Sequence, residues 1–184
     1  MSAARVGTLR AGIVLLAVTF AGIHSLVLSD RFAHLTGDGW VGRRLPSLTL
    51  TLADGRVRPV PQPGPPLVLL AWASWCEPCH AEIRRLLDLQ YSKTVVFGVV
   101  LLNFGESADV VRTHAADFGP GHPAIALDPE REIANRLQIG RLPTTILVDT
   151  TGRVVYRAEG GDQSHVEEIE RRVKLAYEAA AHGL

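Results

Sequence analysis

The apolar run Leu67-Val-Leu-Leu-Ala-Trp72 leads almost directly to the chain's two cysteines, Cys76 and Cys79, and this succession limits the fold most strongly. A continuous apolar strand is typical of a sheet that is covered on both faces, so helices must lie on either side of it. Residues 77–90 carry apolar side chains at helical spacing, which predicts that the cysteines open a helix. The chain therefore predicts a layered α/β domain with a strand–CxxC–helix unit at its centre.

Two thiols three positions apart can close a small disulfide and reopen it, which is redox chemistry. A bridge this short constrains little of the unfolded chain, so structural stabilisation is a poor reason for the pair. The same hexapeptide, Trp75-Cys-Glu-Pro-Cys-His80, also fits the haem-attachment pattern, in which both thiols bind the haem and the histidine ligates its iron. A haem usually needs a second axial ligand, and the only methionine is Met1. The hexapeptide alone leaves both interpretations open.

Strand and helix patterns alternate on both sides of this unit. Asp54-Gly55 joins the first two strands as a hairpin, and Gly152 lies in the turn of a second hairpin. The predicted strands are 45–52, 57–60, 67–72, 94–102, 124–127, 144–149 and 154–158. Four helices are predicted: 77–90, 107–118, one that starts at Asp128-Pro129-Glu130, and a last one capped by Ser164. The last helix has an apolar side made of Val166, Ile169, Val173, Leu175, Ala176 and Ala180. This order predicts a three-layer sandwich in which a central mixed β-sheet has helices on both faces and an extra N-terminal β-hairpin.

The amino end carries a long apolar segment of its own. After Arg5 and Arg10, residues 11–28 contain no formal charge, and eighteen helical residues span about 27 Å, marginally enough for the hydrocarbon core of a bilayer. A cleaved signal peptide is the alternative, because Thr19-Phe-Ala21 has the small residues of a cleavage site. Either interpretation exports the rest of the chain, since the two arginines favour a cytoplasmic amino terminus.

Length and charge fit one exported domain behind this segment. The 184 residues contain 19 lysines and arginines and 19 aspartates and glutamates. The formal net charge is therefore zero, and the protein has no overall positive potential that would favour binding to nucleic acid. We expect a signal anchor at residues 1–30, a linker at 31–40 and the folded domain at 41–184. The protein would then be single-pass in the cytoplasmic membrane, with its domain on the extracytoplasmic, periplasmic side, where the oxidising compartment permits disulfide chemistry.

Two segments far apart in the chain carry a family resemblance. Trp72-Ala-Ser-Trp75 leads into Cys76-Glu77-Pro78-Cys79, and Gly140-Arg-Leu-Pro143-Thr-Thr-Ile-Leu-Val-Asp149 follows later. Over roughly residues 41–180 the chain resembles the thioredoxin superfamily, in particular its membrane-anchored TlpA/ResA/CcmG-like branch of thiol–disulfide oxidoreductases. The resemblance implies a thioredoxin-like fold and a redox pair rather than a haem anchor.

The second segment looks like the cis-proline loop of that family. From spacing alone, Pro143 is an ordinary loop proline that ends the preceding helix, because few X–Pro bonds are cis. The resemblance instead implies a cis bond at Pro143 in a loop that lies against the disulfide. It also implies that the substrate-binding loop consists of Leu142, Pro143 and Thr144, with the backbone of Leu142 pairing with an extended substrate peptide.

The physics of a helix start assigns separate roles to the two thiols. Cys76 would lie at the N-terminus of the helix, where unpaired N–H groups and the macrodipole stabilise a thiolate, so we expect it to attack the substrate. Cys79, nearly one turn further along, would be shielded and would resolve the mixed disulfide. Pro78 holds φ near the helical value and stiffens the loop between the two sulfurs. The resemblance adds Trp75 as a supporting residue, because it belongs to the matching segment.

Glu82 follows Cys79 by three residues, on the helix face that includes it. One interpretation is a solvated glutamate of an amphipathic helix. The other is a partly buried carboxylate that takes a proton from the Cys79 sulfur or repels it. The pattern Cys-Glu-Pro-Cys-x-x-Glu resembles that of ResA-like proteins, whereas Leu70 stands where thioredoxin itself keeps an aspartate. The sequence leaves the two interpretations open.

The residue between the cysteines indicates a direction of electron flow. Glu77 disfavours a thiolate by up to ~1 kcal/mol at contact range in water. Strong oxidants instead stabilise the thiolate of their reduced form, so Glu77 favours a reductant. His80 would oppose this effect if protonated, but we expect it to point to solvent.

The family resemblance also implies partners. Protein disulfides would be the substrates, most commonly the apocytochrome c thiols during cytochrome c maturation, and a membrane thiol reductase would supply the electrons. General disulfide exchange and reduction of a metallochaperone are alternatives within the branch. We predict no cofactor and no metal site, because zinc would need ligands from elsewhere and the chain has no second CxxC.

Two further alternatives remain for the same fold. A thiol peroxidase of the peroxiredoxin type has threonine or serine three residues before its attacking cysteine, and Ala73 occupies that position. A non-catalytic binding module would use the fold only to hold partners.

Overall fold

The computed structural model describes residues 39–119 and 122–181. The predicted signal anchor, residues 1–30, and residues 31–38 of the predicted linker lie outside these ranges, so both stay predictions. Within the described ranges, no helix has the length and apolar character needed to cross a bilayer. The folded unit begins at Trp40, which is buried in the core although it was assigned to the predicted linker.

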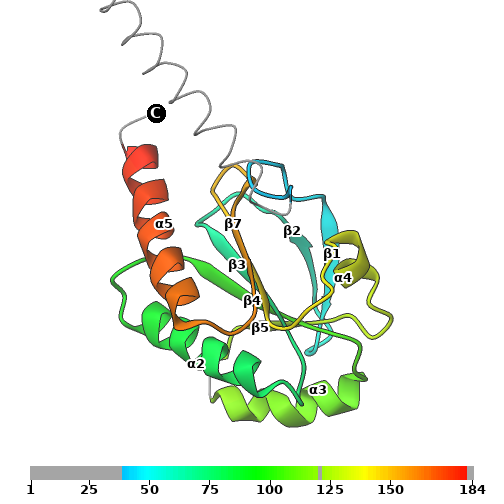
Figure 1. The fold of residues 1–184 in the computed structure, drawn as a ribbon. Helices are drawn as coiled ribbons and strands as arrows, with labels where there is room; N and C mark the ends of the chain where they lie inside the picture. Colours follow the sequence, from blue (N-terminus) through cyan, green and yellow to red (C-terminus); the bar gives the residue numbers. More distant parts are fainter. Residues whose placement is uncertain (1–38, 120–121, 182–184) are drawn as a thin grey trace, which may run out of the picture. The chain divides into compact units, whose positions relative to one another are not determined.

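A seven-stranded mixed sheet forms the centre of this unit (Figure 1). Its strand order is β2-β1-β5-β4-β3-β6-β7. The strands are β1 (Leu48–Leu52), β2 (Val57–Val60), β3 (Leu67–Trp72), β4 (Gly98–Asn103), β5 (Ala124–Leu127), β6 (Thr144–Val148) and β7 (Val154–Glu159). The central strand β3 pairs parallel with β4 and antiparallel with β6. The mixed sheet, the N-terminal hairpin β1–β2 and the second hairpin β6–β7 are confirmed.

The helices cover both faces of the sheet, as predicted. They are α2 (Glu77–Tyr91), α3 (Ala108–Ala115) with the 3₁₀ turn η1 (Ala116–Phe118), α4 (Glu132–Arg136) and α5 (Gln163–Ala181). The helices α2, α3 and α5 contribute buried residues to one hydrophobic cluster, and α2 contacts α5 (Figure 1). The short helix α4 lies over the second cluster, on the opposite face.

The apolar strand β3 supplies both clusters. Its residues Val68, Leu70 and Trp72 face α2, whereas the alternate residues of the strand belong to the cluster under α4. Every residue of β3 is buried. Full burial of one such aliphatic side chain contributes about 1.5–3 kcal/mol, so β3 stabilises the packing on both faces of the sheet.

The predicted start of the fourth helix is wrong. The helix α4 begins at Glu132, and Pro129 and Glu130 form a turn before it. The Asp128 carboxylate still caps the helix, but it accepts hydrogen bonds from the backbone N–H groups of Ile133 (3.1 Å) and Ala134 (2.8 Å). The turn brings the carboxylate to a helix start that lies several residues further along the chain.

The last helix also differs from its prediction. The helix α5 begins at Gln163, and the Asp162 carboxylate accepts a hydrogen bond from the Ser164 N–H at 2.9 Å. Asp162 therefore performs the capping that was assigned to Ser164. On the predicted apolar side, Val166, Ile169 and Val173 are buried, but Leu175 is 50% exposed. The side chains of Ala176 and Ala180 lie outside the described part of the structure.

Candidate active site

Cys76 and Cys79 form a disulfide at the start of α2, with their Cα atoms 5.3 Å apart. Cys76 is the N-cap residue, and its carbonyl accepts hydrogen bonds from the N–H groups of Cys79 (3.0 Å) and His80 (3.3 Å). Cys76 is 5% exposed and Cys79 is 0% exposed. The less buried cysteine is therefore the one at the helix terminus, where the dipole stabilises negative charge.

The rest of the motif lies on the surface. Glu77 and Pro78 are exposed in the first turn of α2, and Trp75 is 70% exposed beside Cys76. The Cys76 N–H donates to the Ala73 carbonyl at 3.1 Å, which ties the motif to the end of β3. The motif thus combines a rigid buried base with an exposed rim that can contact another protein.

The peptide bond between Leu142 and Pro143 is cis, which confirms the prediction from the family resemblance. The Pro143 carbonyl accepts a hydrogen bond from the Gly160 N–H at 2.8 Å. A Cβ on the next residue, Gly161, would lie only 2.8 Å from the Cβ of Pro78. The loop between β7 and α5 therefore contacts both the cis-proline loop and the cysteine motif.

Leu142 and Thr144, the other members of the predicted substrate loop, flank Pro143. Leu142 is half-buried and packs against the hydrophobic cluster that contains both cysteines. Thr144 is fully buried, and its hydroxyl donates to the Arg141 carbonyl at 2.6 Å. The hydroxyl of Thr144 therefore stabilises the loop from inside.

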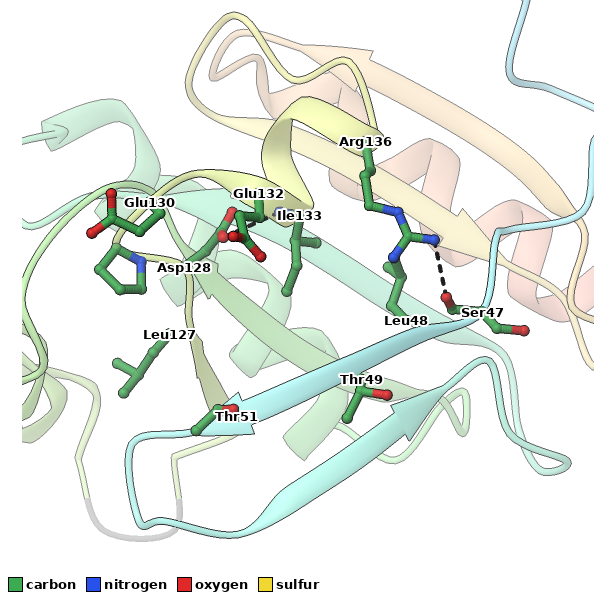
Figure 2. A pocket seen from close by; sticks show the side chains of 11 residues that line it. Ser47, Leu48, Thr49, Thr51, Leu127, Asp128, Glu130, Glu132, Ile133 and Arg136 are labelled. Atoms are coloured by element: carbon green, nitrogen blue, oxygen red, sulfur yellow. Dashed lines mark hydrogen bonds between the residues drawn. The ribbon is translucent and has the colours of Figure 1, made fainter.

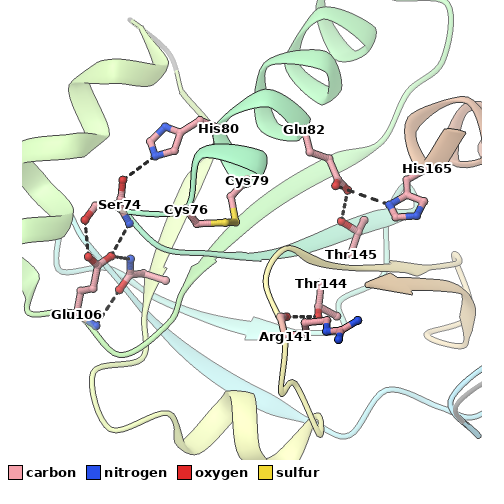
Figure 3. The surroundings of a disulfide bond; sticks show 11 residues. Ser74, Cys76, Cys79, His80, Glu82, Glu106, Arg141, Thr144, Thr145 and His165 are labelled. Carbon is pink, nitrogen blue, oxygen red and sulfur yellow. Dashed lines mark hydrogen bonds and ion pairs between the residues drawn. A yellow bond between two sulfur atoms is a disulfide. The ribbon is translucent and has the colours of Figure 1, made fainter. Parts of the chain in front are cut away.

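Glu82 is 0% exposed, so the interpretation of a solvated glutamate is wrong and the carboxylate is buried. Its Oε1 accepts a hydrogen bond from the Thr145 hydroxyl at 2.5 Å (Figure 3). Burial raises the pKa of Glu82 above its ordinary value, although the Thr145 hydroxyl and the charge of His165 act in the opposite direction. A carboxylate in this state is suited to accept a proton.

His165 is a neighbour of Glu82 that sequence reasoning missed. It lies in the first turn of α5, and its Nδ1 is 3.8 Å from Glu82 Oε2 (Figure 3). The two residues are far apart in the chain and belong to helices that meet only in the folded protein. No local pattern in the sequence joins them.

Sequence reasoning also missed a polar network on the other side of the disulfide. Glu106 accepts hydrogen bonds from the Ser74 N–H (2.8 Å), the Ser74 hydroxyl (2.5 Å) and the Asn103 side-chain amide (2.6 Å). Burial acts to raise the pKa of Glu106, but these bonds outweigh it and hold that pKa below its ordinary value. Glu106 thus anchors the loop that precedes Cys76 to the end of β4.

His80 does not point to solvent as expected. Its Nε2 lies 3.0 Å from the Ser74 carbonyl oxygen, and because a carbonyl only accepts, this nitrogen donates the hydrogen. The ring stacks on Phe118 at 5.7 Å and meets the edge of Trp72 at 5.8 Å. Side chains of a helix lean toward its N-terminus, which turns His80 back over the loop before Cys76.

Comparison with known proteins agrees with this geometry. A family model described as Redoxin matches residues 40–173. The chain belongs to the Redoxin family. This redoxin is similar to thiol-disulfide oxidoreductase ResA of Geobacillus thermodenitrificans, with 31% identity over 144 residues that cover 77% of this chain and 81% of the relative. It is also similar to the thiol:disulfide interchange protein DsbE homolog of Paracoccus denitrificans, with 31% identity over 146 residues that cover 77% and 78%.

Solved structures show the same fold. A Chlorobium tepidum protein assigned as the thiol:disulfide interchange protein DsbE is 25% identical, with a TM-score of 0.64 over 74% of this chain and 96% of that chain. Together with the Cys76–Cys79 disulfide, these relatives identify the redoxin as a thioredoxin-like thiol–disulfide oxidoreductase. The redox interpretation of the hexapeptide is confirmed.

A surface pocket of about 390 Å³ lies elsewhere in this redoxin, between β1 and α4 (Figure 2). Neither cysteine lines it, and neither does Pro143. Two of its polar side chains stabilise the fold. Asp128 caps α4, and Arg136 donates a hydrogen bond to the Ser47 carbonyl at 3.3 Å. The pocket is therefore a junction between two elements, and the redox chemistry lies at the disulfide.

Proposed function

We propose that this redoxin is a membrane-tethered, extracytoplasmic reductant of protein disulfides. The observation that carries the proposal is a helix-terminal disulfide with a buried carboxylate behind it and a cis-proline loop beside it. The exposed Trp75 and the half-buried Leu142 offer apolar contact to a substrate on that surface. Residues 11–28 have the length and hydrophobicity of a membrane anchor, which supports the tether.

The reduced enzyme would act in two exchange steps. In the first, the Cys76 thiolate attacks one sulfur of the substrate disulfide, the substrate S–S bond breaks, and one substrate thiolate leaves and takes a proton. In the second, the Cys79 sulfur attacks Cys76 Sγ, the mixed disulfide breaks, and the second substrate thiol is released. Two electrons pass to the substrate, and the enzyme is left with the Cys76–Cys79 disulfide.

Glu82 supplies the base for the second step. Cys79 is fully buried, so its thiol cannot lose its proton readily to bulk water. Glu82 lies three residues further along α2, is equally buried, and has a raised pKa because burial disfavours its charge. It would accept the proton of Cys79 as that sulfur attacks Cys76.

The direction of electron flow is supported by the residue between the cysteines. Glu77 is exposed in the first turn of α2, so its charge acts on Cys76 through solvent. Its effect is at most ~1 kcal/mol, which destabilises the thiolate of the reduced protein by a modest amount and so favours the donation of electrons. A membrane thiol reductase would return electrons to the disulfide, because the outer compartment supplies no reducing pool.

Apocytochrome c is the substrate that the family resemblance favours, through the thiols of its haem-attachment motif. Relatives named ResA and DsbE support a role in the same branch of oxidoreductases. General disulfide exchange and reduction of a metallochaperone are the alternatives. All three use the same two steps at Cys76 and Cys79.

Trapping of substrates tests the function. A Cys79→Ser variant cannot perform the second step, so it should accumulate mixed disulfides on Cys76 in cells, and mass spectrometry would identify the trapped proteins. The matched control is the double variant with Cys76→Ser, which should trap nothing. If the Cys79→Ser variant forms no mixed disulfide with any protein in cells that make cytochrome c, the proposal is contradicted.

Three measurements separate the alternatives. Rapid peroxide consumption that is lost with Cys76→Ser would indicate a thiol peroxidase, and a Soret absorbance band in the purified protein would indicate haem. Full biological activity of a Cys76→Ala variant would indicate a non-catalytic binding module. A reduction potential near that of strong oxidants, about −120 mV, would reverse the proposed direction.

A further inference from the structure

The buried carboxylate of Glu82 is only half satisfied. Oε1 accepts the Thr145 hydroxyl, but Oε2 has no hydrogen-bond partner in the part of the chain that the structure describes. His165 Nδ1 lies 3.8 Å from Oε2, and this nitrogen also lacks a hydrogen-bond partner among the described residues (Figure 3). Two unpartnered polar atoms that face each other in a buried space are close to a hydrogen bond, which they would form after a shift of about 1 Å.

His165 also connects this space to the surface. The Glu82 side chain is 0% exposed, whereas the His165 side chain is 14% exposed. Because Nδ1 is itself buried, the exposed part of the imidazole lies beyond that atom. The ring of Tyr156 packs against the imidazole at 6.3 Å and limits its rotation. The imidazole therefore reaches from the carboxylate to water.

We propose that His165 is a positioning residue that carries the proton of Glu82 to solvent during disulfide exchange. The inference rests on the proposed function, in which Glu82 accepts a proton from Cys79. An imidazole can accept a proton at one ring nitrogen and release another from the second, so it suits this transfer.

The proton balance is simple. The Cys79 thiol gives its proton to Glu82 while its sulfur attacks Cys76 Sγ and the substrate thiolate departs. Glu82 Oε2–H then donates to His165 Nδ1, and the proton on Nε2 passes to water. Glu82 returns to its carboxylate form, and His165 is left with its proton on Nδ1. When a donor reduces the disulfide again, Cys79 takes up a proton by the reverse transfers, which restores the proton on Nε2. No oxidant or reductant is needed beyond the dithiol and the substrate disulfide.

Several charged groups face the pair and set its surroundings. Arg85 on α2 and Asp162 before α5 act on Glu82 and His165 respectively. Tyr156 on β7, with a pKa raised to about 12 mainly by burial, stays protonated. Glu168 and Arg172 on α5 form an ion pair with each other at 2.5 Å, next to Tyr156. Of these groups Tyr156 is neutral and Glu168 is paired with Arg172, whereas Arg85 and Asp162 act on the pair through their charges.

The test uses the full chain in detergent and a synthetic peptide with one internal disulfide. Rapid mixing of the reduced protein with this peptide measures the release of the mixed disulfide. His165→Gln keeps the size and polarity of the side chain, and it should slow release about 10-fold, which is less than the ~10²–10⁴ typical of a direct acid–base group. The reduction potential should stay unchanged, because a proton carrier alters rates and not equilibria.

Two further variants complete the design. In His165→Ala, added imidazole should restore most of the lost rate. His122→Gln is the matched control, and it should leave the rate unchanged. His122 is exposed and, among the described residues, it bonds the adjacent Pro123 carbonyl at 2.8 Å.

The outcomes are distinguishable. If release in His165→Gln stays within twofold of the wild-type rate, the inference fails. A slower release with an altered potential and no rescue by imidazole would also overturn it, because this would indicate an electrostatic or structural role. If Glu82→Gln does not slow release either, it is the proposed role of Glu82 that fails.

Discussion

Two glutamates lie on opposite sides of the Cys76–Cys79 disulfide and differ in almost every property except residue type (Figure 3). Glu106 is half-buried and receives three hydrogen bonds, two from Ser74 and one from Asn103. Within the part of the chain that the structure describes, Glu82 is fully buried and receives one, from Thr145. The pKa of Glu106 is lowered and that of Glu82 is raised.

The difference shows that the supply of hydrogen-bond donors, and not the residue type, decides the role of a carboxylate beside a redox pair. Donors that are fixed by the fold keep Glu106 ionised, so it can hold the loop before Cys76 in place. A buried carboxylate with too few donors has a higher affinity for a proton, so Glu82 can act as a base. One side of the site is therefore a structural anchor and the other side is reactive.

The largest expected effect is on the rate of disulfide exchange. Glu82→Gln keeps the shape of the side chain but removes its ability to take a proton, so release of the mixed disulfide should slow by about 10²-fold or more. Glu106→Gln should cause a much smaller loss, because Glu106 contacts the loop and not the sulfurs. Rapid-mixing kinetics with the same peptide disulfide measure both. Equal losses in the two variants would remove the distinction between anchor and base.

The second effect is on stability. Glu106→Ala leaves the Ser74 hydroxyl and the buried Asn103 amide without their acceptor, which should lower the free energy of unfolding by about 1–3 kcal/mol. Glu82→Gln removes a buried charge and keeps an acceptor for Thr145, so at neutral pH it should leave stability unchanged or raise it. Urea denaturation measures both variants. A larger loss for Glu82→Gln would contradict the assignment of Glu106 as the anchor.

The sequence alone predicted the parts of the site that depend on local order. The strand before the cysteines, the helix after them and the position of Glu82 follow from residues that are close together in the chain. The cis bond at Pro143 came from the family resemblance and not from spacing. The contacts of Glu106 with Ser74 and of Glu82 with Thr145 span 32 and 63 residues, and no periodic pattern encodes them.

The errors have a similar cause. The pair Asp128-Pro129 predicts a helix start, but a turn separates it from the first residue of α4. The Asp128 carboxylate therefore caps a helix that begins several residues further along the chain. His80 reads as a solvated residue of an exposed turn, yet the aromatic rings of Trp72 and Phe118 hold it over the loop. In both cases tertiary contacts outweigh the local preference.

The third prediction concerns pH, where the two carboxylates should act with opposite signs. Because the pKa of Glu82 is raised in the folded protein, its contribution to stability is present below the ordinary carboxyl pKa and is lost as pH rises through the raised value. Because the pKa of Glu106 is lowered, its contribution is present above the ordinary value and is lost as pH falls through the lowered one.

Urea denaturation from about pH 3 to pH 8 tests this. Relative to the wild type, Glu82→Gln should gain stability as pH rises, and Glu106→Gln should recover stability as pH falls. Each unit of difference in pKa corresponds to about 1.4 kcal/mol. Parallel curves for the two variants would show that the carboxylates titrate alike and that donor supply does not separate them.

The smallest effects should come from removing one donor on each side. Ser74→Ala removes the hydroxyl but leaves the Ser74 N–H and Asn103 on Glu106, so stability should fall by about 0.5–1.5 kcal/mol with little change in the pH profile of exchange. Thr145→Val keeps the shape of the side chain but removes the hydroxyl that donates to Glu82, which should raise the pKa of that carboxyl further. The pH profile of mixed-disulfide release should therefore move to higher pH in Thr145→Val alone. If Ser74→Ala moves it equally, the polar network of Glu106 is coupled to the chemistry and the two sides of the disulfide act as one site.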